Sequence, residues 1–253
     1  MLQHRASSFF YNTQPLFCIC SDMGKILLLE TATQICSVAL AVDKKIVASR
    51  ISNAPNAHSS SLAVFVAETM KESGLPFKSL DAVCVSSGPG SYTGLRIGVS
   101  TAKGLCYALG IPLIAVETLQ SMTDLFISKN SSFSDYICPM IDARRMEVYT
   151  AVFDKKGTRL EPTAAKVVEE NSFEEYLNKG TVAFFGDGAT KTQQLLGNNR
   201  NAIYDLPFSF SAEGLLNEAF NKYEAGNFED VAYFEPFYLK DFVAKKPTVK
   251  GLL

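Results

Sequence analysis

The sequence lacks the marks of several protein classes. No apolar run approaches the ~20 residues that a membrane-spanning helix needs. The 6 cysteines form no CxxC pair and no zinc-ribbon spacing, which favours reduced core thiols in a cytoplasmic protein over a metal or redox site. Lys and Arg number 24 against 26 Asp and Glu, a formal net charge of -2. The chain therefore has no basic excess of the kind that binds nucleic acid unaided.

Histidine is also scarce, which restricts metal binding and acid–base catalysis. His4 and His58 are the two histidines, and Leu62 stands four residues after His58, so an HxxxH metal pair is absent. There is no Gly-x-Ser-x-Gly elbow, and one usable histidine disfavours serine or cysteine triad chemistry. We therefore assign no catalytic residue and no metal ligand.

Three carboxylates stand where the chain is expected to turn. Glu30 and Asp142 each end a predicted strand, and Asp187 lies between two glycines. Such carboxylates could hold Mg²⁺ through water, and they could equally cap turns. Turn capping is the favoured role for Asp187. For Glu30 and Asp142 both roles, Mg²⁺ binding and turn capping, stay open.

What is present is an alternation of strands and helices. Apolar segments joined by short turns predict three successive strands, followed by a helix capped at Ser59 or Ser60 and ended by Gly74. The expected order of the first half is βββαβαβ: strands 26–30, 36–42 and 46–51, helix 59–73, strand 80–86, helix 95–109 and strand 113–116.

The second half repeats much of this order. Its predicted elements are strands 136–141, 147–153 and 158–168, a short helix at 173–177, strand 182–185, and helices 190–196 and 212–224. Pro139 predicts an edge position or a bulge for its strand. A meander followed by crossovers, occurring twice, predicts an α/β chain of two lobes with mixed sheets.

The expected boundaries follow from these elements. Residues 1–22 are expected to be an extension outside the fold, 23–117 the first lobe and 118–253 the second. The helix at 212–224 could pack back on the first lobe.

A glycine-rich loop at 86–98 joins a predicted strand to a helix N-terminus, where free backbone N–H groups favour an anion. Ser91 and Thr93 add hydroxyl groups. The loop is not a P-loop, because Leu95 rather than Lys follows Gly94.

Two further interpretations of this loop remain open. Gly88, Gly90 and Gly94, with Glu117 after the next strand, could form a variant dinucleotide-binding site. Alternatively, the glycines make a tight turn, and Gly94 and Gly98 open one helix face for close packing.

The sequence resembles the TsaB (YeaZ) family over about residues 25–240. The most specific segment is Ser-Gly-Pro-Gly-Ser-Tyr-Thr-Gly-Leu-Arg-Ile-Gly at 87–98. The other matching segments are 26–33, 36–40, 58–59, 102–105, 142–145, 147–149, 186–189 and 236–239.

The resemblance implies the actin-like ATPase (ASKHA, ribonuclease-H-like) fold and a bacterial subunit that helps make threonylcarbamoyladenosine at position 37 of tRNAs reading ANN codons. It implies that the paralogue TsaD holds the metal and transfers the carbamoyl group, whereas TsaB is a scaffold without metal histidines. The implied partners are TsaD and TsaE, with tRNA reached only through the complex and a homodimer when the chain is alone. The complex would use ATP and Mg²⁺, and this chain would have no cofactor of its own.

The resemblance also suggests where TsaD docks, on the helices near 59–73 and 94–109. The expected docking residues are Leu62, Phe65, Val66, Thr69, Gly94, Arg96, Gly98, Ala102 and Leu105. The expected nucleotide-facing residues are Glu30, Thr31, Gly88, Gly90, Ser91, Thr93, Asp142, Gly186 and Asp187. We expect Gly98→Glu, or a charge at Ala102, to abolish the complex while the isolated chain stays folded.

Rival functions are a stand-alone actin-like ATPase, a peptidase and a dinucleotide-binding enzyme. The lysines at 240, 245, 246 and 250 could touch tRNA phosphates, although a solvated tail is favoured.

Overall fold

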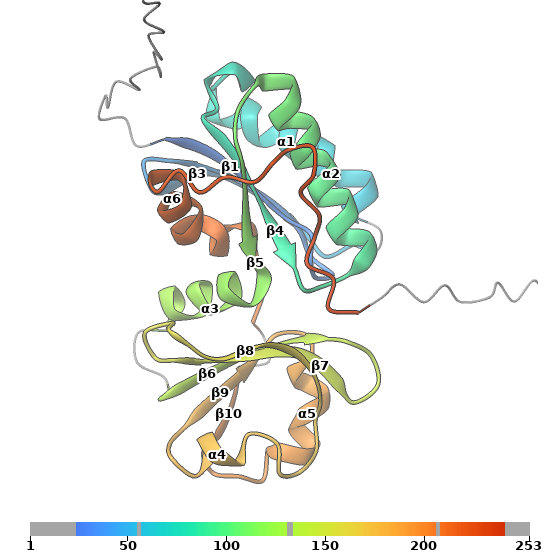
Figure 1. Ribbon diagram of the computed structural model, residues 1–253, viewed down its shortest axis with the longest axis vertical. Coiled ribbons are helices and arrows are strands. Elements are labelled where there is room, and N and C mark those ends of the chain that lie inside the picture. Colours follow the sequence, from blue (N-terminus) through green and yellow to red (C-terminus); the bar gives the residue numbers. More distant parts are fainter. Residues whose placement is uncertain (1–23, 55–56, 131–133, 206–207, 241–253) are drawn as a thin grey trace, which may run out of the picture.

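The computed structural model describes residues 24–54, 57–130, 134–205 and 208–240. It contains two lobes, each built on a five-stranded mixed sheet (Figure 1). The expected extension at 1–22 and the lysines after residue 240 lie outside the described residues. Among the described residues, no helix is both long and apolar enough to cross a membrane.

The first sheet has the strand order β3-β2-β1-β4-β5. Its antiparallel meander consists of β1 (Lys25–Glu30), β2 (Cys36–Val42) and β3 (Lys45–Ser52). The parallel strands are β4 (Ala82–Gly88) and β5 (Leu113–Glu117). Both faces of this sheet are apolar, so both must be covered.

Two helices cover one face of the first sheet, and a C-terminal return covers the other. The helices α1 (Ala57–Ser73) and α2 (Tyr92–Leu109) bury their apolar faces against it, with the short η1 (Phe77–Ser79) between them in sequence. The turn η2 (Ala212–Leu215) and α6 (Leu216–Glu224) pack on the opposite face.

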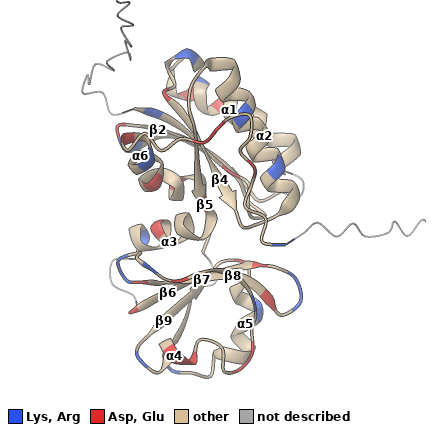
Figure 2. Ribbon diagram, in the orientation of Figure 1, with Lys and Arg blue, Asp and Glu red and all other residues tan. Residues whose placement is uncertain are grey.

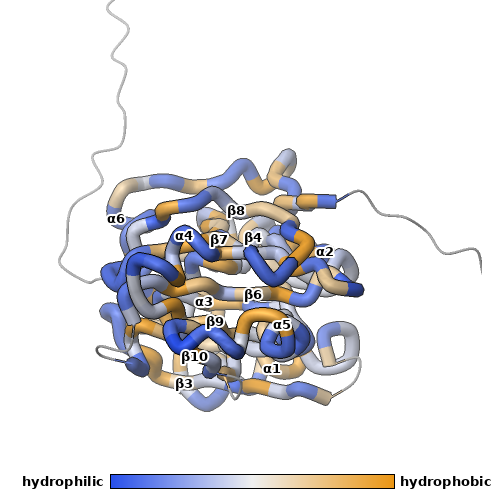
Figure 3. Tube along the Cα trace, turned by 90° about the horizontal axis from the view of Figure 1, so that it is seen from below, coloured by the Kyte–Doolittle hydropathy of each residue, from blue (hydrophilic) through white to orange (hydrophobic). Residues whose placement is uncertain are grey.

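The second sheet has the strand order β10-β9-β6-β7-β8. Its strands are β6 (Tyr136–Asp142), β7 (Glu147–Asp154), β8 (Arg159–Val167), β9 (Val182–Phe185) and β10 (Ala202–Asp205). The helix α3 (Thr118–Lys129) packs on one face, and α4 (Glu174–Leu177) and α5 (Ala189–Leu196) on the other. Figure 3 shows that strands of this lobe carry hydrophobic residues, whereas the segments around them are largely hydrophilic.

The expected two-lobed α/β fold with mixed sheets is confirmed, with differences in detail. The strand β10, which the sequence pattern did not predict, completes the βββαβαβ order of the second lobe. The helix α1 begins at Ala57, so neither Ser59 nor Ser60 is its N-cap. The edge position or bulge expected for Pro139 is wrong, because β6 lies between β9 and β7 and pairs with both without a shift of register. There the Thr150 hydroxyl donates to the Pro139 carbonyl at 2.9 Å.

The last described segment, residues 227–240, forms what we call the C-terminal strap. It returns along the first lobe, where the Glu229 N–H donates to the Leu113 carbonyl and the Phe237 N–H to the Ser87 carbonyl. The Lys103 ammonium group donates to the carbonyls of Ala232 (3.0 Å) and Phe234 (3.1 Å). The strap is therefore fastened to α2 and reaches the space between the lobes.

Candidate functional site

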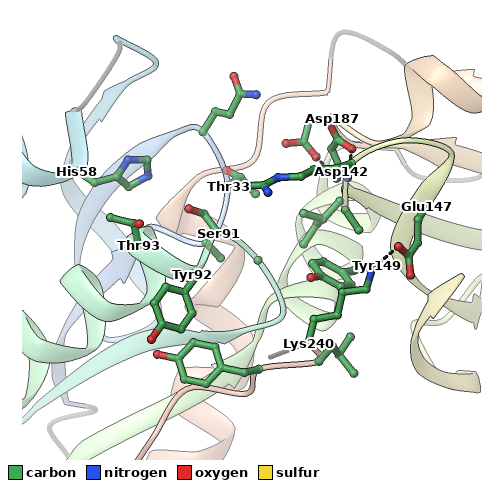
Figure 4. Close-up of a pocket in the computed structure, with 18 of the residues that line it drawn as sticks. Thr33, His58, Ser91, Tyr92, Thr93, Asp142, Glu147, Tyr149, Asp187 and Lys240 are labelled. Atoms are coloured by element: carbon green, nitrogen blue, oxygen red, sulfur yellow. Dashed lines mark hydrogen bonds and ion pairs between the residues drawn. The ribbon is translucent and has the colours of Figure 1, made fainter. Parts of the chain in front are cut away.

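A cleft of about 920 Å³ lies between the lobes. The first lobe contributes Thr33, His58 and residues 90–93, and the second lobe contributes the turn between β6 and β7 together with Asp187. The strap adds residues 237–240 at the mouth. Figure 4 shows His58, Ser91 and Thr93 on one wall and Asp142, Glu147 and Asp187 on the other.

Close backbone contact explains the glycines of the loop. A Cβ on Gly90 would lie 2.2 Å from the Ala32 carbonyl oxygen, and one on Gly94 would lie 2.1 Å from the Thr31 carbonyl oxygen. The Ser91 N–H donates to the Ala32 carbonyl at 2.7 Å. The loop therefore lies directly on the end of β1, which confirms the tight turn with a packing face.

The N-terminus of α2 opens on the cleft. Ser91 caps this helix, because its hydroxyl accepts from the Gly94 N–H at 3.3 Å. The side chains of Ser91 and Thr93 are exposed and line the cavity. Hydroxyl groups and the first N–H groups of a long helix together suit an anionic group.

Several residues expected to face a nucleotide lie beneath the cleft instead. Glu30 is fully buried, and its Oε1 accepts from the Ala32 N–H at 2.6 Å, while Oε2 has no hydrogen-bond partner among the described residues. Burial raises the pKa of this carboxyl to about 7. The Thr31 hydroxyl donates to the Gly94 carbonyl at 2.8 Å. These two residues, with the buried Gly88, support the loop rather than line the cavity.

The second-lobe wall is a network around Asp142. Its carboxylate pairs with Lys191 and accepts from the Arg144 N–H at 2.7 Å. The Asp142 N–H donates to the Asp187 carboxylate at 2.9 Å, and burial raises the pKa of Asp187. Gly186 is buried and adopts a φ of 96°, where a Cβ would meet the Met140 carbonyl at 2.4 Å. Asp187 thus sits in a turn, as its glycine neighbours predicted.

Aromatic rings gather where the strap meets α2. The rings of Tyr92 and Tyr238 are 5.0 Å apart, and the Arg96 guanidinium lies over the Tyr92 ring at 5.5 Å. Lys240 of the strap pairs with Glu147 of the second lobe, so the strap contacts both lobes. The strap residues 237–240 were not predicted to line the cavity, although the segment 236–239 belongs to the family pattern.

Most of the expected docking residues face the core of their own lobe. Phe65 and Leu105 are partly buried against it, Arg96 is exposed, and the fully buried ones are Leu62, Val66, Thr69, Gly94, Gly98 and Ala102. A Cβ on Gly98 would lie 2.2 Å from the Thr31 hydroxyl. A side chain at Gly98 must therefore displace Thr31, so Gly98→Glu is expected to destabilise the chain itself as well as a complex.

The outward face of the same helices carries different residues. Val64 is 50% exposed, Tyr107 is 86% exposed, and a Cβ on Gly104 would meet nothing within 4 Å. The helical period could have identified this face, because it lies opposite the buried positions.

Glu117, the acidic residue of the possible dinucleotide-binding site, is engaged elsewhere. Glu117 forms an ion pair with Arg159 at 2.7 Å and accepts from the Thr163 hydroxyl, so it joins the first lobe to β8. Among the described residues, no group of three His, Cys, Asp or Glu could hold a metal ion.

Comparisons with known proteins identify what the chain is similar to. The family model described as TsaD, tRNA N6-adenosine threonylcarbamoyltransferase, matches residues 45–250. The chain is 31% identical to the tRNA threonylcarbamoyladenosine biosynthesis protein TsaB of Escherichia coli, covering 88% of this chain and 97% of that protein. It is 33% identical to TsaB of Bacillus subtilis, covering 54% of this chain and 58% of that protein.

Solved structures show the same fold. YeaZ from Pseudomonas aeruginosa superposes with a TM-score of 0.74 at 24% identity, covering 85% of this chain and 100% of that one. A second protein from that organism, described as similar to peptidase YEAZ, gives a TM-score of 0.76 at 25% identity, covering 86% and 100%.

Proposed function

The chain belongs to the TsaB (YeaZ) family of tRNA threonylcarbamoyladenosine biosynthesis proteins, and from this premise we propose that it is a non-catalytic subunit. It docks onto a TsaD-type threonylcarbamoyltransferase, is joined by TsaE, and is required for modification of adenosine 37 in tRNAs reading ANN codons. The assembly works in the cytoplasm, and tRNA reaches this chain only through the complex.

The observation that carries the proposal is the outward face of α1 and α2. Val64 on α1 and Tyr107 on α2 are large side chains exposed to solvent, and a Cβ on Gly104, one turn before Tyr107, would meet nothing within 4 Å. A helix with a glycine on its outer face lets another helix approach closely. Tyrosine is among the residues enriched at interface hot spots, and Tyr107 is 86% exposed in the chain alone.

The charged groups of the cleft support a non-catalytic role. Glu147 is paired with Lys240 and Asp142 with Lys191, so neither is a free general base. His58 has Leu62 rather than a second histidine on its helix face. The partner subunits then supply the metal, and the complex uses ATP and Mg²⁺.

The same face can close on a second copy when TsaD is absent. A two-fold dimer would bring the two faces together. A stable interface of either kind needs roughly 1,600 Å² of total buried surface.

Co-purification of the full chain with TsaD tests the proposal. Gly104→Arg should abolish the complex, because the new side chain fills the space that the partner helix needs. Gln194→Arg, at an exposed position of α5 in the second lobe, is the matched control and should leave co-purification unchanged. Undiminished recovery of TsaD with the Gly104 variant would contradict docking at this face.

A turnover assay tests the non-catalytic role. The purified chain with ATP, Mg²⁺ and tRNA should form no modified tRNA, whereas addition of TsaD and TsaE should restore the reaction. Modification, ATP hydrolysis or peptide cleavage by the chain alone would contradict the proposal.

A further inference from the structure

The C-terminal strap is anchored to the first lobe at several points. Near its start the Glu229 N–H donates to the Leu113 carbonyl at 2.9 Å, and near its end the Phe237 N–H donates to the Ser87 carbonyl at 2.7 Å. Between these two bonds, Phe234 packs against the apolar core beneath α1 and α2. Chain ends are poorly ordered unless they are tied down, and these contacts tie the strap down.

The first lobe is shaped to receive the strap. Gly88 has a φ of 109°, and a Cβ at this position would lie 2.6 Å from the Phe237 carbonyl oxygen. The ring of Tyr238 lies against the ring of Tyr92, with their centroids 5.0 Å apart. The glycine at 88 therefore leaves room for the backbone of the strap, so the position of the strap is built into the fold of this lobe.

Beyond this anchored stretch the strap reaches the second lobe. The Lys240 ammonium group pairs with the Glu147 carboxylate at the start of β7. Figure 4 shows the ammonium group of Lys240 directed at Glu147. Figure 2 shows charges of both signs scattered over both lobes rather than gathered into facing patches. The attraction between the strap and the second lobe is therefore local to this ion pair.

This ion pair and the polypeptide connection join the lobes at two separate places. Glu147 and the strap residues 237–240 all line the cleft. The chain passes between the lobes where β5 is followed by α3, and there Glu117 pairs with Arg159 at 2.7 Å, outside the lining of the cleft. Figure 1 shows the end of the strap away from this junction. The junction resembles a hinge, and the strap closes the opposite part of the gap.

We propose that the strap is a clasp, which holds the two lobes together across the cleft and opens when Lys240 and Glu147 separate. The lobes then turn about the junction between β5 and α3, and the cleft widens. Hinged motions of this kind are absorbed by a few residues at the ends of elements. The proposal does not rest on docking to TsaD, because Val64, Gly104 and Tyr107 take no part in the clasp.

The exposure of the ion pair limits the strength of the clasp. The side chains of Lys240 and Glu147 are 41% and 21% exposed. Ion pairs at protein surfaces change an equilibrium by up to about fivefold. The clasp therefore favours the closed arrangement of the lobes without locking it, and its loss should raise the ratio of open to closed chains by a factor of this size.

Double electron–electron resonance on the full chain measures the opening as a distance between the lobes. One nitroxide is attached at the exposed position Ala67 of α1 and the other at the exposed position Gln194 of α5, each through an introduced cysteine. The background carries Cys18→Ser and Cys20→Ser. The other four cysteines of the chain are buried, and buried thiols are inert to labels.

Exchanging the charges of the clasp separates its effect from that of a simple surface change. Glu147→Lys places two positive charges together, so the population at longer distances should grow about two- to fivefold. The double variant Glu147→Lys, Lys240→Glu brings opposite charges together again and should restore the original distances. Glu170→Lys reverses an exposed charge of the second lobe outside the cleft; it is the matched control and should leave the distances unchanged.

Salt offers a second measurement that needs no substitution in the clasp. Raising the salt concentration from about 0.05 M to about 1 M screens an exposed ion pair, so the labelled chain should shift toward longer distances. The proposal fails if either Glu147→Lys or salt leaves the distances unchanged, or if the double variant does not restore them. It also fails if Glu147→Lys speeds hydrogen exchange at residues 229–237 without any change in distance, because the strap would then cover the first lobe without joining the two.

Discussion

Replacing Glu30 by Gln should stabilise the chain at pH 8 and leave it nearly unchanged at pH 4. Glu30 is fully buried at the end of β1, and burial raises its pKa from 4.5 to about 7. Gln has the same shape. Its amide oxygen can keep the bond from the Ala32 N–H, and its amide group can donate toward the Ser86 hydroxyl, which has no partner among the described residues.

The sign and size of the effect follow from linkage. The folded chain binds the Glu30 proton more tightly than the unfolded chain, so the stability that this group contributes is fully present below pH 4.5 and is lost as the pH rises to 7. At about 1.36 kcal/mol per pKa unit, the loss reaches about 3 kcal/mol above pH 7. Glutamine does not ionise and avoids this loss.

Urea unfolding of both chains between pH 4 and pH 8 measures the effect. The difference between their free energies of unfolding should grow from near zero to about 3 kcal/mol in favour of the Gln variant. Burial also raises the pKa of Asp124, to about 6, and this adds a pH dependence to the stability of both chains. Because that contribution is the same in both, it cancels in the difference between their free energies of unfolding. The exposed Glu170→Gln serves as control and should show no such growth. A difference that stays constant with pH, or one that widens toward acid, would refute the reasoning.

The remaining predictions concern α2. Gly98→Ala should destabilise the chain by about 1–3 kcal/mol, because the new Cβ would overlap the Thr31 hydroxyl. Gly104→Ala should stabilise the chain by about 0.5–1 kcal/mol, because its Cβ meets nothing and alanine favours the helix. Urea unfolding measures both free energies, and equal effects of the two variants would contradict this packing. Tyr107→Ala should weaken TsaD binding by about 2 kcal/mol, roughly thirtyfold, at unchanged melting temperature; titration with TsaD measures this, and unaltered affinity would remove Tyr107 from the interface. Lys103→Met should release the strap, which hydrogen exchange reports as faster exchange at residues 229–237; unchanged exchange would show that the strap is held by other contacts.

Much of the fold follows from local patterns. The buried strands β1 and β2 read as apolar runs, and Gly74 and Gly110 end helices α1 and α2 in the left-handed conformation expected of them. The short strand β10 escaped detection because its four residues are only half-buried and give no clear alternation. The predicted start of the first helix was also wrong, since α1 begins at Ala57, before either predicted cap.

The candidate site was predicted only in part. The residues that do line the cleft are Gly90, Ser91, Thr93, Asp142 and Asp187, since each lies at or soon after the end of a strand that meets the space between the lobes. Periodicity showed that Leu62 and Val66 share a face, yet it does not say whether that face is covered by the chain itself or by a partner. The sheet beneath α1 and α2 covers it, and this leaves the opposite face, with Val64 and Tyr107, exposed.

The sequence by itself determined the types of the elements, their duplication into two lobes, and the family. Hydrophobic period and turn residues indicate the elements, and the segment at 87–98 indicates the family. All of these are properties of residues that are neighbours along the chain. Only the tertiary structure decided which residues meet across the cleft. Ser91 and Arg144 are brought to facing walls by two separate sheets, and the strap adds Tyr238 from the far end of the chain. Such contacts depend on how the lobes and the strap pack together, and no local pattern encodes that packing.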